Sequence, residues 1–201
     1  MKSQVSHLPY LELYQVRRYK YLKKLLALIL PIIFILNIST PIECEAETNP
    51  TLDATTAGIV WSSCDDEVRK TLPIEYQAHA CGMTVEEFTL MARVIQMESN
   101  GTYDWSDLED KILIACVILN RVESSSFNNT ITTVLTQSGQ FTTVSGGGCS
   151  CAYSDSSRWA IVEAQRRLIH EEVPTNLLYF NSIGYASTPY CYEGGNYFSL
   201  G

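Results

Sequence analysis

The chain has 201 residues with ordinary aliphatic and aromatic content, so it can form one globular domain with a substantial core. Residues 47–201 hold eight basic and nineteen acidic side chains, a net charge of −11. A domain this acidic repels the phosphates of nucleic acids and of anionic membranes, which argues against both as partners.

The first 46 residues have the composition of an export signal. Five basic residues beginning at Arg17 precede an uncharged apolar run over 25–38. This run contains Pro31 and is shorter than the ~20 residues that a membrane-spanning helix needs. We predict a signal peptide over residues 1–46, cleaved after Ala46, with an uncleaved signal anchor as the alternative. Either one sends the rest of the chain across the membrane, because the basic cluster stays inside.

The seven cysteines fit an exported protein. Cleavage after Ala46 would leave six, and an even number is compatible with disulfides in an oxidising compartment. Six cysteines allow fifteen pairings, so the connectivity stays open, and Cys116 lies in an apolar stretch where a buried thiol is equally expected. Cys149, Cys151, Cys191 and a histidine lack the second paired motif of a zinc site, so we predict no metal and no other cofactor.

Two capping boxes predict where the first helices start. Thr84 and Glu87 begin a helix over residues 85–99, and Ser106 and Glu109 begin a second one, DLEDKILIACVILNRV, with one apolar face. The polar stretch before them, residues 47–73, is expected to be a flexible linker that leads into a domain over residues 74–201.

The second half of the chain is richer in loops. Its expected elements are a short helix capped by Thr130, a Gly/Ser-rich loop over 137–157, a helix after Ser156 or Ser157, and strands at 177–181 and 194–201. The pattern predicts a mainly helical α+β domain with short strands.

One carboxylate stands out against the first helix. The apolar stripe of this helix consists of Phe88, Met91, Ala92 and Ile95. Continued in steps of three and four, it reaches Glu98 and Ser99. Loss of hydration raises the pKa of a glutamate above its reference value of ~4.3, and such a glutamate can act as the general acid of glycoside cleavage. The alternative is a solvent-exposed last turn, although a carboxylate at a helix C-terminus is disfavoured by the macrodipole.

The order of five motifs adds a family resemblance. LMARVIQMESNG, IACVILNRVES, TQSGQF, LLYFN and EGGNYF, spread over residues 90–198, resemble the SleB and CwlJ family of cell wall hydrolases. The resemblance implies a lysozyme-like fold, no cofactor, and peptidoglycan strands of N-acetylmuramic acid and N-acetylglucosamine as substrate. It implies that Glu98 is the catalytic acid. The pair Glu98-Ser99 also resembles lytic transglycosylases and goose-type lysozymes, where the serine would hydrogen-bond the glutamate or an N-acetyl group.

The chain departs from the family pattern at several points. The family's second acid is replaced by Thr102, its LYFHN motif reads LYFNS here with Asn181 in place of the histidine, and its GGH motif ends in Asn196. No second carboxylate is clearly placed, since Asp107 and Glu109 are expected to serve the next helix terminus. We therefore favour a lytic transglycosylase with one catalytic glutamate, which leaves a 1,6-anhydro product. One alternative is lysozyme-type hydrolysis, which normally uses two carboxylates. The other is a non-catalytic wall-binding module.

Five further residues are candidates for substrate binding. Three of them have a structural alternative, which for Tyr179 is that of an ordinary half-buried tyrosine. Arg121 is expected to contact substrate or to form an ion pair. Gln140 and Phe141 would offer an amide and an aromatic face to a sugar, although Phe141 could equally be a packing residue. Tyr179 and Asn181 flank Phe180 and would project to one face of a strand.

Another enzyme class is disfavoured. A cysteine amidase needs a thiolate beside a histidine, and neither His79 nor His170 has a sequence position that suggests such a dyad. We expect a monomeric enzyme that acts outside the cell or in the wall, with contact to the membrane only through an uncleaved N-terminal segment.

Overall fold

The computed structural model describes residues 53–99, 103–141, 144 and 149–201, which belong to one unit, Thr51–Gly201. The export signal expected over residues 1–46 lies outside this part of the chain. Within the described ranges, no helix has both the length and the apolar character needed to cross a bilayer.

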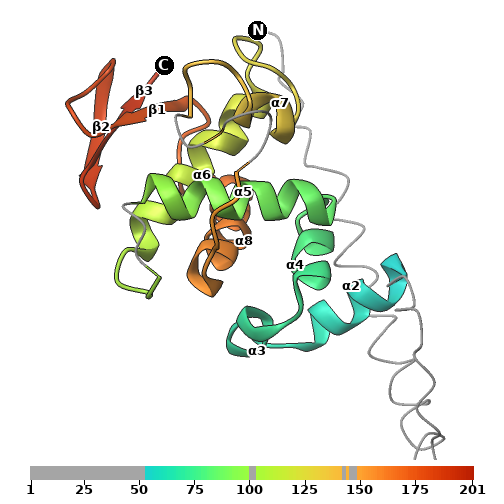
Figure 1. Ribbon diagram of the computed structural model, residues 1–201. Helices are drawn as coiled ribbons and strands as arrows, with labels where there is room; N and C mark the ends of the chain where they lie inside the picture. The colour runs from blue at the N-terminus through green and yellow to red at the C-terminus, as the bar shows by residue number, and fades with distance from the viewer. Residues whose placement is uncertain (1–52, 100–102, 142–143, 145–148) are drawn as a thin grey trace, which may run out of the picture. The chain divides into compact units, whose positions relative to one another are not determined.

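Figure 1 shows a helical body with a small three-stranded sheet at one side. The helices are α2 (Ala54–Ser63), α3 (Asp66–Thr71), α4 (Ile74–Ala80), α5 (Val85–Glu98), α6 (Leu108–Glu123), α7 (Ile131–Leu135) and α8 (Asp155–Ile169). The strands are β1 (Leu177–Asn181), β2 (Thr188–Glu193) and β3 (Asn196–Leu200). The predicted class, a mainly helical α+β domain with short strands, is confirmed.

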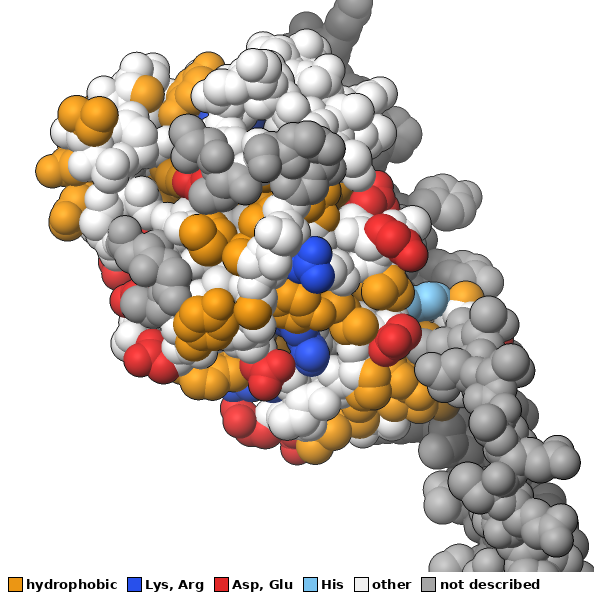
Figure 2. Space-filling view, in the orientation of Figure 1, with side chains coloured by type: hydrophobic (Ala, Val, Ile, Leu, Met, Phe, Trp, Pro, Cys, Tyr) orange, Lys and Arg blue, Asp and Glu red, His pale blue; other side chains and the backbone are white. Residues whose placement is uncertain are grey.

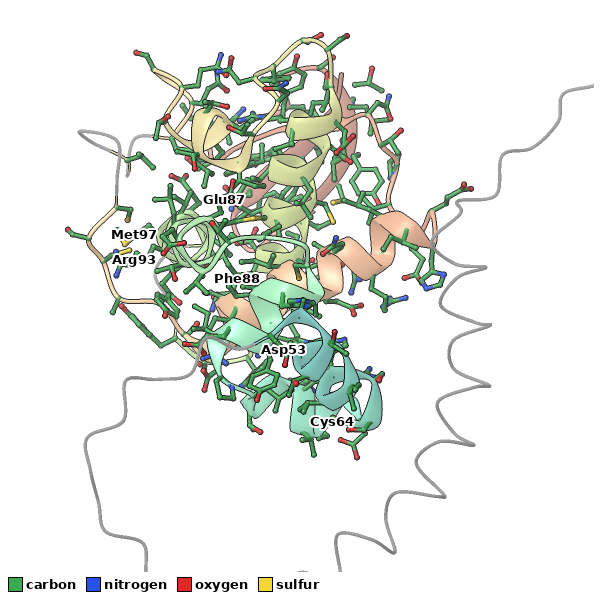
Figure 3. All side chains as sticks on the ribbon, turned by 90° about the vertical axis from the view of Figure 1, so that its right-hand side faces the viewer. Asp53, Cys64, Glu87, Phe88, Arg93 and Met97 are labelled. Atoms are coloured by element: carbon green, nitrogen blue, oxygen red, sulfur yellow. The ribbon has the colours of Figure 1, made fainter. Side chains whose placement is uncertain are left out.

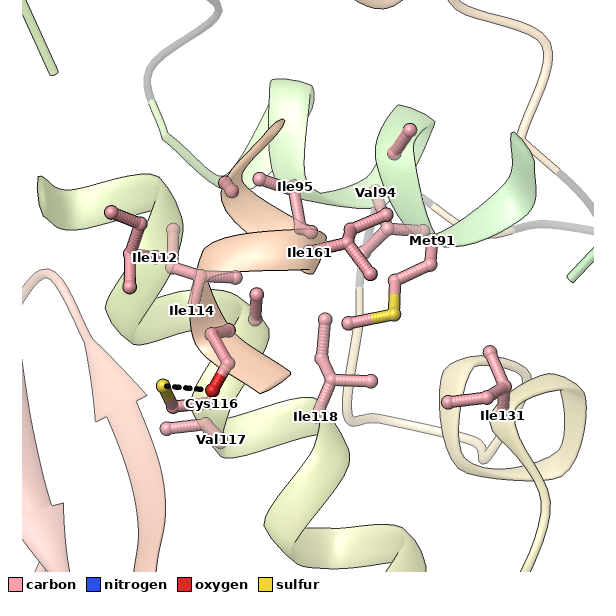
Figure 4. Packing of buried hydrophobic residues seen from close by; sticks show 14 of the residues in the cluster. Met91, Val94, Ile95, Ile112, Ile114, Cys116, Val117, Ile118, Ile131 and Ile161 are labelled. Atoms are coloured by element: carbon pink, nitrogen blue, oxygen red, sulfur yellow. Dashed lines mark hydrogen bonds between the residues drawn. The ribbon is translucent and has the colours of Figure 1, made fainter. Parts of the chain in front are cut away.

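The core lies where α5, α6 and α8 meet. Figure 4 shows Met91 and Ile95 of α5 turned toward Ile118 of α6 and Ile161 of α8, and all four are fully buried. The thiol of Cys116 is also buried, 4.0 Å from the carbonyl oxygen of Ala164 on α8. These contacts follow from the apolar stripes in the sequence, which place one face of each helix inward.

The residues expected to form a flexible linker are partly helical. Asp53 and Asp65 cap α2 and α3 by accepting hydrogen bonds from backbone N–H groups. The buried side chain of Gln77 donates to the carbonyl of Arg69 at 3.0 Å, and Arg158 of α8 donates to the carbonyl of Leu72 at 2.7 Å. The expectation of a linker is therefore wrong over residues 54–71, because polar side chains from α4 and α8 hold the end of this segment in place.

Of the four helix N-terminal caps predicted from the sequence, two are present in the structure. The capping box of Thr84 and Glu87 and the cap by Thr130 are both present. The capping box expected at Ser106 is wrong. The backbone N–H of Ser106 donates to Asp104, and Asp107 is the N-cap residue of α6, where its side chain does not cap the helix.

The last helix starts earlier than expected, because its cap is Ser154. Ser154 accepts from the backbone N–H of Ser157 at 3.2 Å. Ser154 and Ser157 both donate their hydroxyls to the buried side-chain oxygen of Gln96 on α5, at 2.6 and 2.7 Å. The start of α8 is thereby hydrogen-bonded to α5.

The sheet has the order β1-β3-β2 and all its pairs are antiparallel. Strands β1 and β3 match the predicted strands. Strand β2 was missed because five of its six side chains are exposed and Pro189 lies within it, so it lacks the alternation that marks a half-buried strand.

Candidate active site

The candidate acid Glu98 is the last residue of α5. Its side chain is half-buried, while Ser99, the C-cap residue, is fully buried. The Ser99 hydroxyl donates to the carbonyl of Gln96 at 3.3 Å, so in this structure it serves the helix end. The predicted roles of Glu98 as the acid and of Ser99 as a substrate contact remain predictions.

An asparagine from the sheet reaches the end of α5. The buried amide of Asn196 on β3 donates to the backbone oxygen of Glu98 at 3.4 Å and to a carboxylate oxygen of Asp110 at 3.0 Å. The last carbonyls of a helix have no partner within the helix, so an outside donor completes the end of α5. Asn196 thus links the backbone of Glu98 to a second acidic residue.

That second acid, Asp110, lies in the first turn of α6 and is fully buried. One of its carboxylate oxygens has no hydrogen-bond partner among the described residues. Burial raises the pKa of Asp110 to about 7 and outweighs the lowering effect of the Asn196 hydrogen bond. Nearby Asp107 and Glu193 raise this pKa further, and Lys111 lowers it.

Asp110 was missed in the sequence, although a signal for it was there. It lies three and seven residues before Leu113 and Val117, which are both buried, so it continues an apolar stripe of its helix. This is the argument that singled out Glu98. The acidic residues of this region were all assigned to the helix terminus instead.

The turn between β2 and β3 packs directly on Asp110. Gly194 has a φ of +57°, a conformation that favours glycine. A Cβ atom added there would lie 2.4 Å from both Cβ and Cγ of Asp110. The absence of a side chain at position 194 therefore allows the turn to cover the carboxylate.

Arg121 lies in a pocket of aromatic rings. Its guanidinium carbon is 5.0 Å from the ring centre of Phe127, 5.5 Å from that of Phe141 and 6.0 Å from that of Tyr179. Its Nε donates to the carbonyl of Leu178 at 2.8 Å, and burial lowers its pKa to about 10, so it stays charged at neutral pH. The ion pair offered as one interpretation is not found among the described carboxylates, and one guanidinium nitrogen, Nη1, is buried without a partner there.

The other predicted substrate contacts differ in their access to solvent. Gln140 is exposed, whereas Phe141 is only 3% exposed and packs 6.2 Å from Phe180 between ring centres. In this structure Phe141 offers almost no surface to a sugar and serves the packing around Arg121. Tyr179 is half-buried against Arg121, and the side-chain oxygen of Asn181 accepts from the backbone N–H groups after β1.

The structure thus brings the sequence-predicted residues into two groups. Glu98 and Ser99 lie at the end of α5, beside Asn196. Arg121, Phe141 and Tyr179 lie together where α6, the loop after α7 and β1 meet.

A cluster of three tyrosines, two on the sheet and one in the loop before β2, is a further candidate that the sequence did not single out. The ring centre of Tyr197 lies 4.6 Å from that of Tyr192 and 5.1 Å from that of Tyr185. Tyr192 and Tyr185 are 56% and 42% exposed, and Tyr197 directly follows Asn196. Figure 2 shows hydrophobic side chains gathered at the left, over the sheet. Flat aromatic surfaces with a polar tip suit contact with the faces of sugar rings.

A cavity of about 240 Å³ lies elsewhere, between α2, α3, α4 and α8. It is lined by residues that include Trp61, Trp159, Arg69 and His170, and by none of the predicted site residues.

The chain is similar to cell wall hydrolases over part of its length. Residues 105–196 match the family model described as Cell Wall Hydrolase, and this match supports the SleB/CwlJ-type family. The matched segment contains Asp110, Arg121 and Asn196 but begins after Glu98.

Two relatives are spore cortex-lytic enzymes of Bacillus cereus. Each is 32% identical to the chain over 102 residues, which is 50% of this chain and 36% of the relative. The chain therefore matches little more than a third of the length of these relatives. No solved structure matches the chain.

Proposed function

We propose that the chain is an exported enzyme that degrades peptidoglycan by cutting the bond between N-acetylmuramic acid and N-acetylglucosamine. The observation that carries the proposal is the position of Glu98, half-buried at the end of α5 and tied by Asn196 to the segment that matches the cell wall hydrolases. The export predicted from residues 1–46 gives the enzyme access to this substrate.

Glu98 is proposed to act as a lytic transglycosylase acid and base. Its carboxyl group donates a proton to the glycosidic oxygen as the bond to C1 of the muramic acid breaks. The resulting carboxylate then takes the proton of the 6-hydroxyl, whose oxygen attacks C1 and forms the 1,6-anhydro ring. The chain's own residues hold the acid in place, since Asn196 binds the backbone of Glu98 and Ser99 completes the helix end.

Burial of Asp110 supports a reaction with one carboxylate. An inverting or retaining hydrolase needs a second carboxylate in contact with a water molecule or with the sugar ring. Asp110 is 0% exposed and lies beneath Gly194, so it is not placed to contact a sugar bound at the surface. Its proposed role is to fix the Asn196 amide.

The tyrosine cluster favours a second candidate function, that of a non-catalytic wall-binding module. Tyr185, Tyr192 and Tyr197 offer a binding surface whether or not Glu98 is catalytic. Retained binding without cleavage would identify this function.

The test compares the purified full chain with its Glu98→Gln variant on peptidoglycan, with soluble fragments analysed by mass spectrometry. Glu86→Gln, an exposed change in the first turn of the same helix, is the matched control. Anhydro-muramic ends from the parent and the control, lost in Glu98→Gln, are expected. Reducing ends would mean hydrolysis, and no fragments from any protein, with binding retained, would mean the binding module.

A further inference from the structure

Two cysteine thiols lie in contact beside α5. The sulfur atoms of Cys149 and Cys151 are 3.1 Å apart, roughly 1 Å longer than the ~2.05 Å of a disulfide bond. Both cysteines are free thiols in this structure. A short movement of either side chain would therefore bring the two sulfurs to bonding distance.

The pair is held in this position by Arg93 of α5, which is labelled in Figure 3. The guanidinium of Arg93 donates to the carbonyl of Cys149 at 2.9 Å, and the thiol of Cys151 donates to the carbonyl of Arg93 at 3.3 Å. One helix residue thus contacts both cysteines, through its side chain and through its backbone. This arrangement fixes the two thiols relative to each other before any bond forms.

The two thiols differ in their access to solvent. Cys149 is 7% exposed and belongs to the hydrophobic core, whereas Cys151 is half-buried at the edge of that core. Burial raises the pKa of Cys151 to about 11, with Cys149 as a further cause. Cys151 is therefore the thiol that an external reagent reaches first, and its reaction is slow near neutral pH.

We infer that Cys149 and Cys151 are a dithiol oxidation site that forms an intramolecular disulfide by exchange with a disulfide oxidant, such as oxidised glutathione or an exported oxidoreductase. The thiolate of Cys151 attacks the oxidant, which forms a mixed disulfide and releases one thiolate. The thiolate of Cys149 then attacks the sulfur of Cys151 and releases the second. Two cysteine thiols become one disulfide, the oxidant's disulfide becomes two thiols, and two protons and two electrons are transferred.

The short loop that a Cys149–Cys151 disulfide would close indicates a reversible bond and not one that stabilises the fold. A disulfide stabilises a protein mainly by closing a loop in the unfolded chain, and the effect grows with the length of that loop. One residue, Ser150, separates the two cysteines, so closure restricts the unfolded chain very little. Formation of the bond also removes the thiol proton that Cys151 donates to Arg93. Reducing agents are therefore expected to open the bond readily.

The test uses the full chain, reduced and then exposed to oxidised glutathione, and alkylated with N-ethylmaleimide before digestion with trypsin. The peptide 122–158 contains these two cysteines and no other, so its mass reports their state directly. The expected product is the peptide without alkylation and two hydrogen masses lighter. Dithiothreitol should return it to the doubly alkylated form. Cys191→Ser, which changes an unrelated cysteine, should give the same result.

Single variants test the order of the two steps. Cys149→Ser should accumulate the glutathione adduct on Cys151, whereas Cys151→Ser should form an adduct on Cys149 several-fold more slowly. Two alkylated thiols after oxidation of the parent chain, or a bond from either residue to another cysteine, would overturn the inference. The readout does not depend on glycan cleavage. The dithiol inference can therefore fail while the proposed enzyme activity holds, and the proposed activity can fail while the dithiol inference holds.

Discussion

Replacement of Asp110 by Asn should remove a pH-dependent loss of stability. The pKa of Asp110 is raised from 3.8 to about 7 in the folded protein, mainly by burial. Below a pH of about 4 the group is protonated in both states and makes no difference to stability. Between about pH 4 and pH 7 the unfolded chain releases this proton while the folded protein keeps it, so the free energy of unfolding falls as the pH rises.

The magnitude follows from the size of the shift. Each pKa unit corresponds to ~1.4 kcal/mol, so Asp110 costs about 4 kcal/mol of stability once the pH exceeds 7. Of this, about 2 kcal/mol is lost between pH 5.5 and pH 8. Carboxylates with a lowered pKa, such as Glu163 and Glu172, complete their titration below that window and do not contribute to the difference.

The assay is urea unfolding of the full chain and of Asp110→Asn at pH 5.5 and pH 8, since the amide cannot titrate. The difference in unfolding free energy between variant and parent should rise by about 2 kcal/mol from the lower pH to the higher one. Asp107→Asn, which removes only a minor cause of the raised pKa of Asp110, should show a much smaller rise. If the unfolding free energies of Asp110→Asn and the parent changed equally between the two pH values, the assignment of a buried, protonated Asp110 would be refuted.

Three further predictions concern the sheet and the aromatic pocket. Tyr192→Ala should weaken binding to insoluble peptidoglycan several-fold in a pull-down assay, whereas Tyr190→Ala on the same strand should leave this binding unchanged. An equal loss of binding in both variants would argue against a sugar-binding surface at Tyr192. Gly194→Ala should lower the unfolding free energy by about 3 kcal/mol because its Cβ would overlap Asp110, while Gly184→Ala, with open space around it, should cost far less. Arg121→Lys should cost about 2 kcal/mol in urea unfolding by loss of the guanidinium stacking and its backbone hydrogen bond, and a neutral effect would contradict the structural role of the pocket.

The sequence predicted those parts of the fold that depend on local patterns. The stripe from Phe88 to Ile95 gave the buried face of α5, and the spacing of Thr84 and Glu87 gave its start. Strand β1 and strand β3 followed from their apolar residues. Strand β2 was missed because its place in the sheet depends on pairing with β3 and not on burial of its own side chains.

The site was harder to predict because its contacts join distant segments. Glu98 and Arg121 were singled out by position and resemblance, but the hydrogen bond between Asn196 and Asp110 spans 86 residues of the chain. Phe141 illustrates the opposite case, since an aromatic residue beside a polar loop has no local pattern that separates a sugar contact from a packing residue. Only the three-dimensional position of Arg121 identifies Phe141 as part of a cation–aromatic cluster.

The hydrogen bonds around Gln96 have a consequence for how the end of α5 responds to heating. Gln96 lies two residues before Glu98, and its side-chain oxygen accepts from the Ser154 backbone at 3.1 Å as well as from two serine hydroxyls of the α8 terminus. Fraying of the last turn of α5 would therefore expose a buried polar cluster and detach the start of α8. Helix ends commonly open independently of the rest of a protein, but here the amide protons near Glu98 should exchange with solvent at the rate set by cooperative unfolding of the core. Loss of the proposed active-site geometry around Glu98 and melting of the domain should then occur at the same temperature.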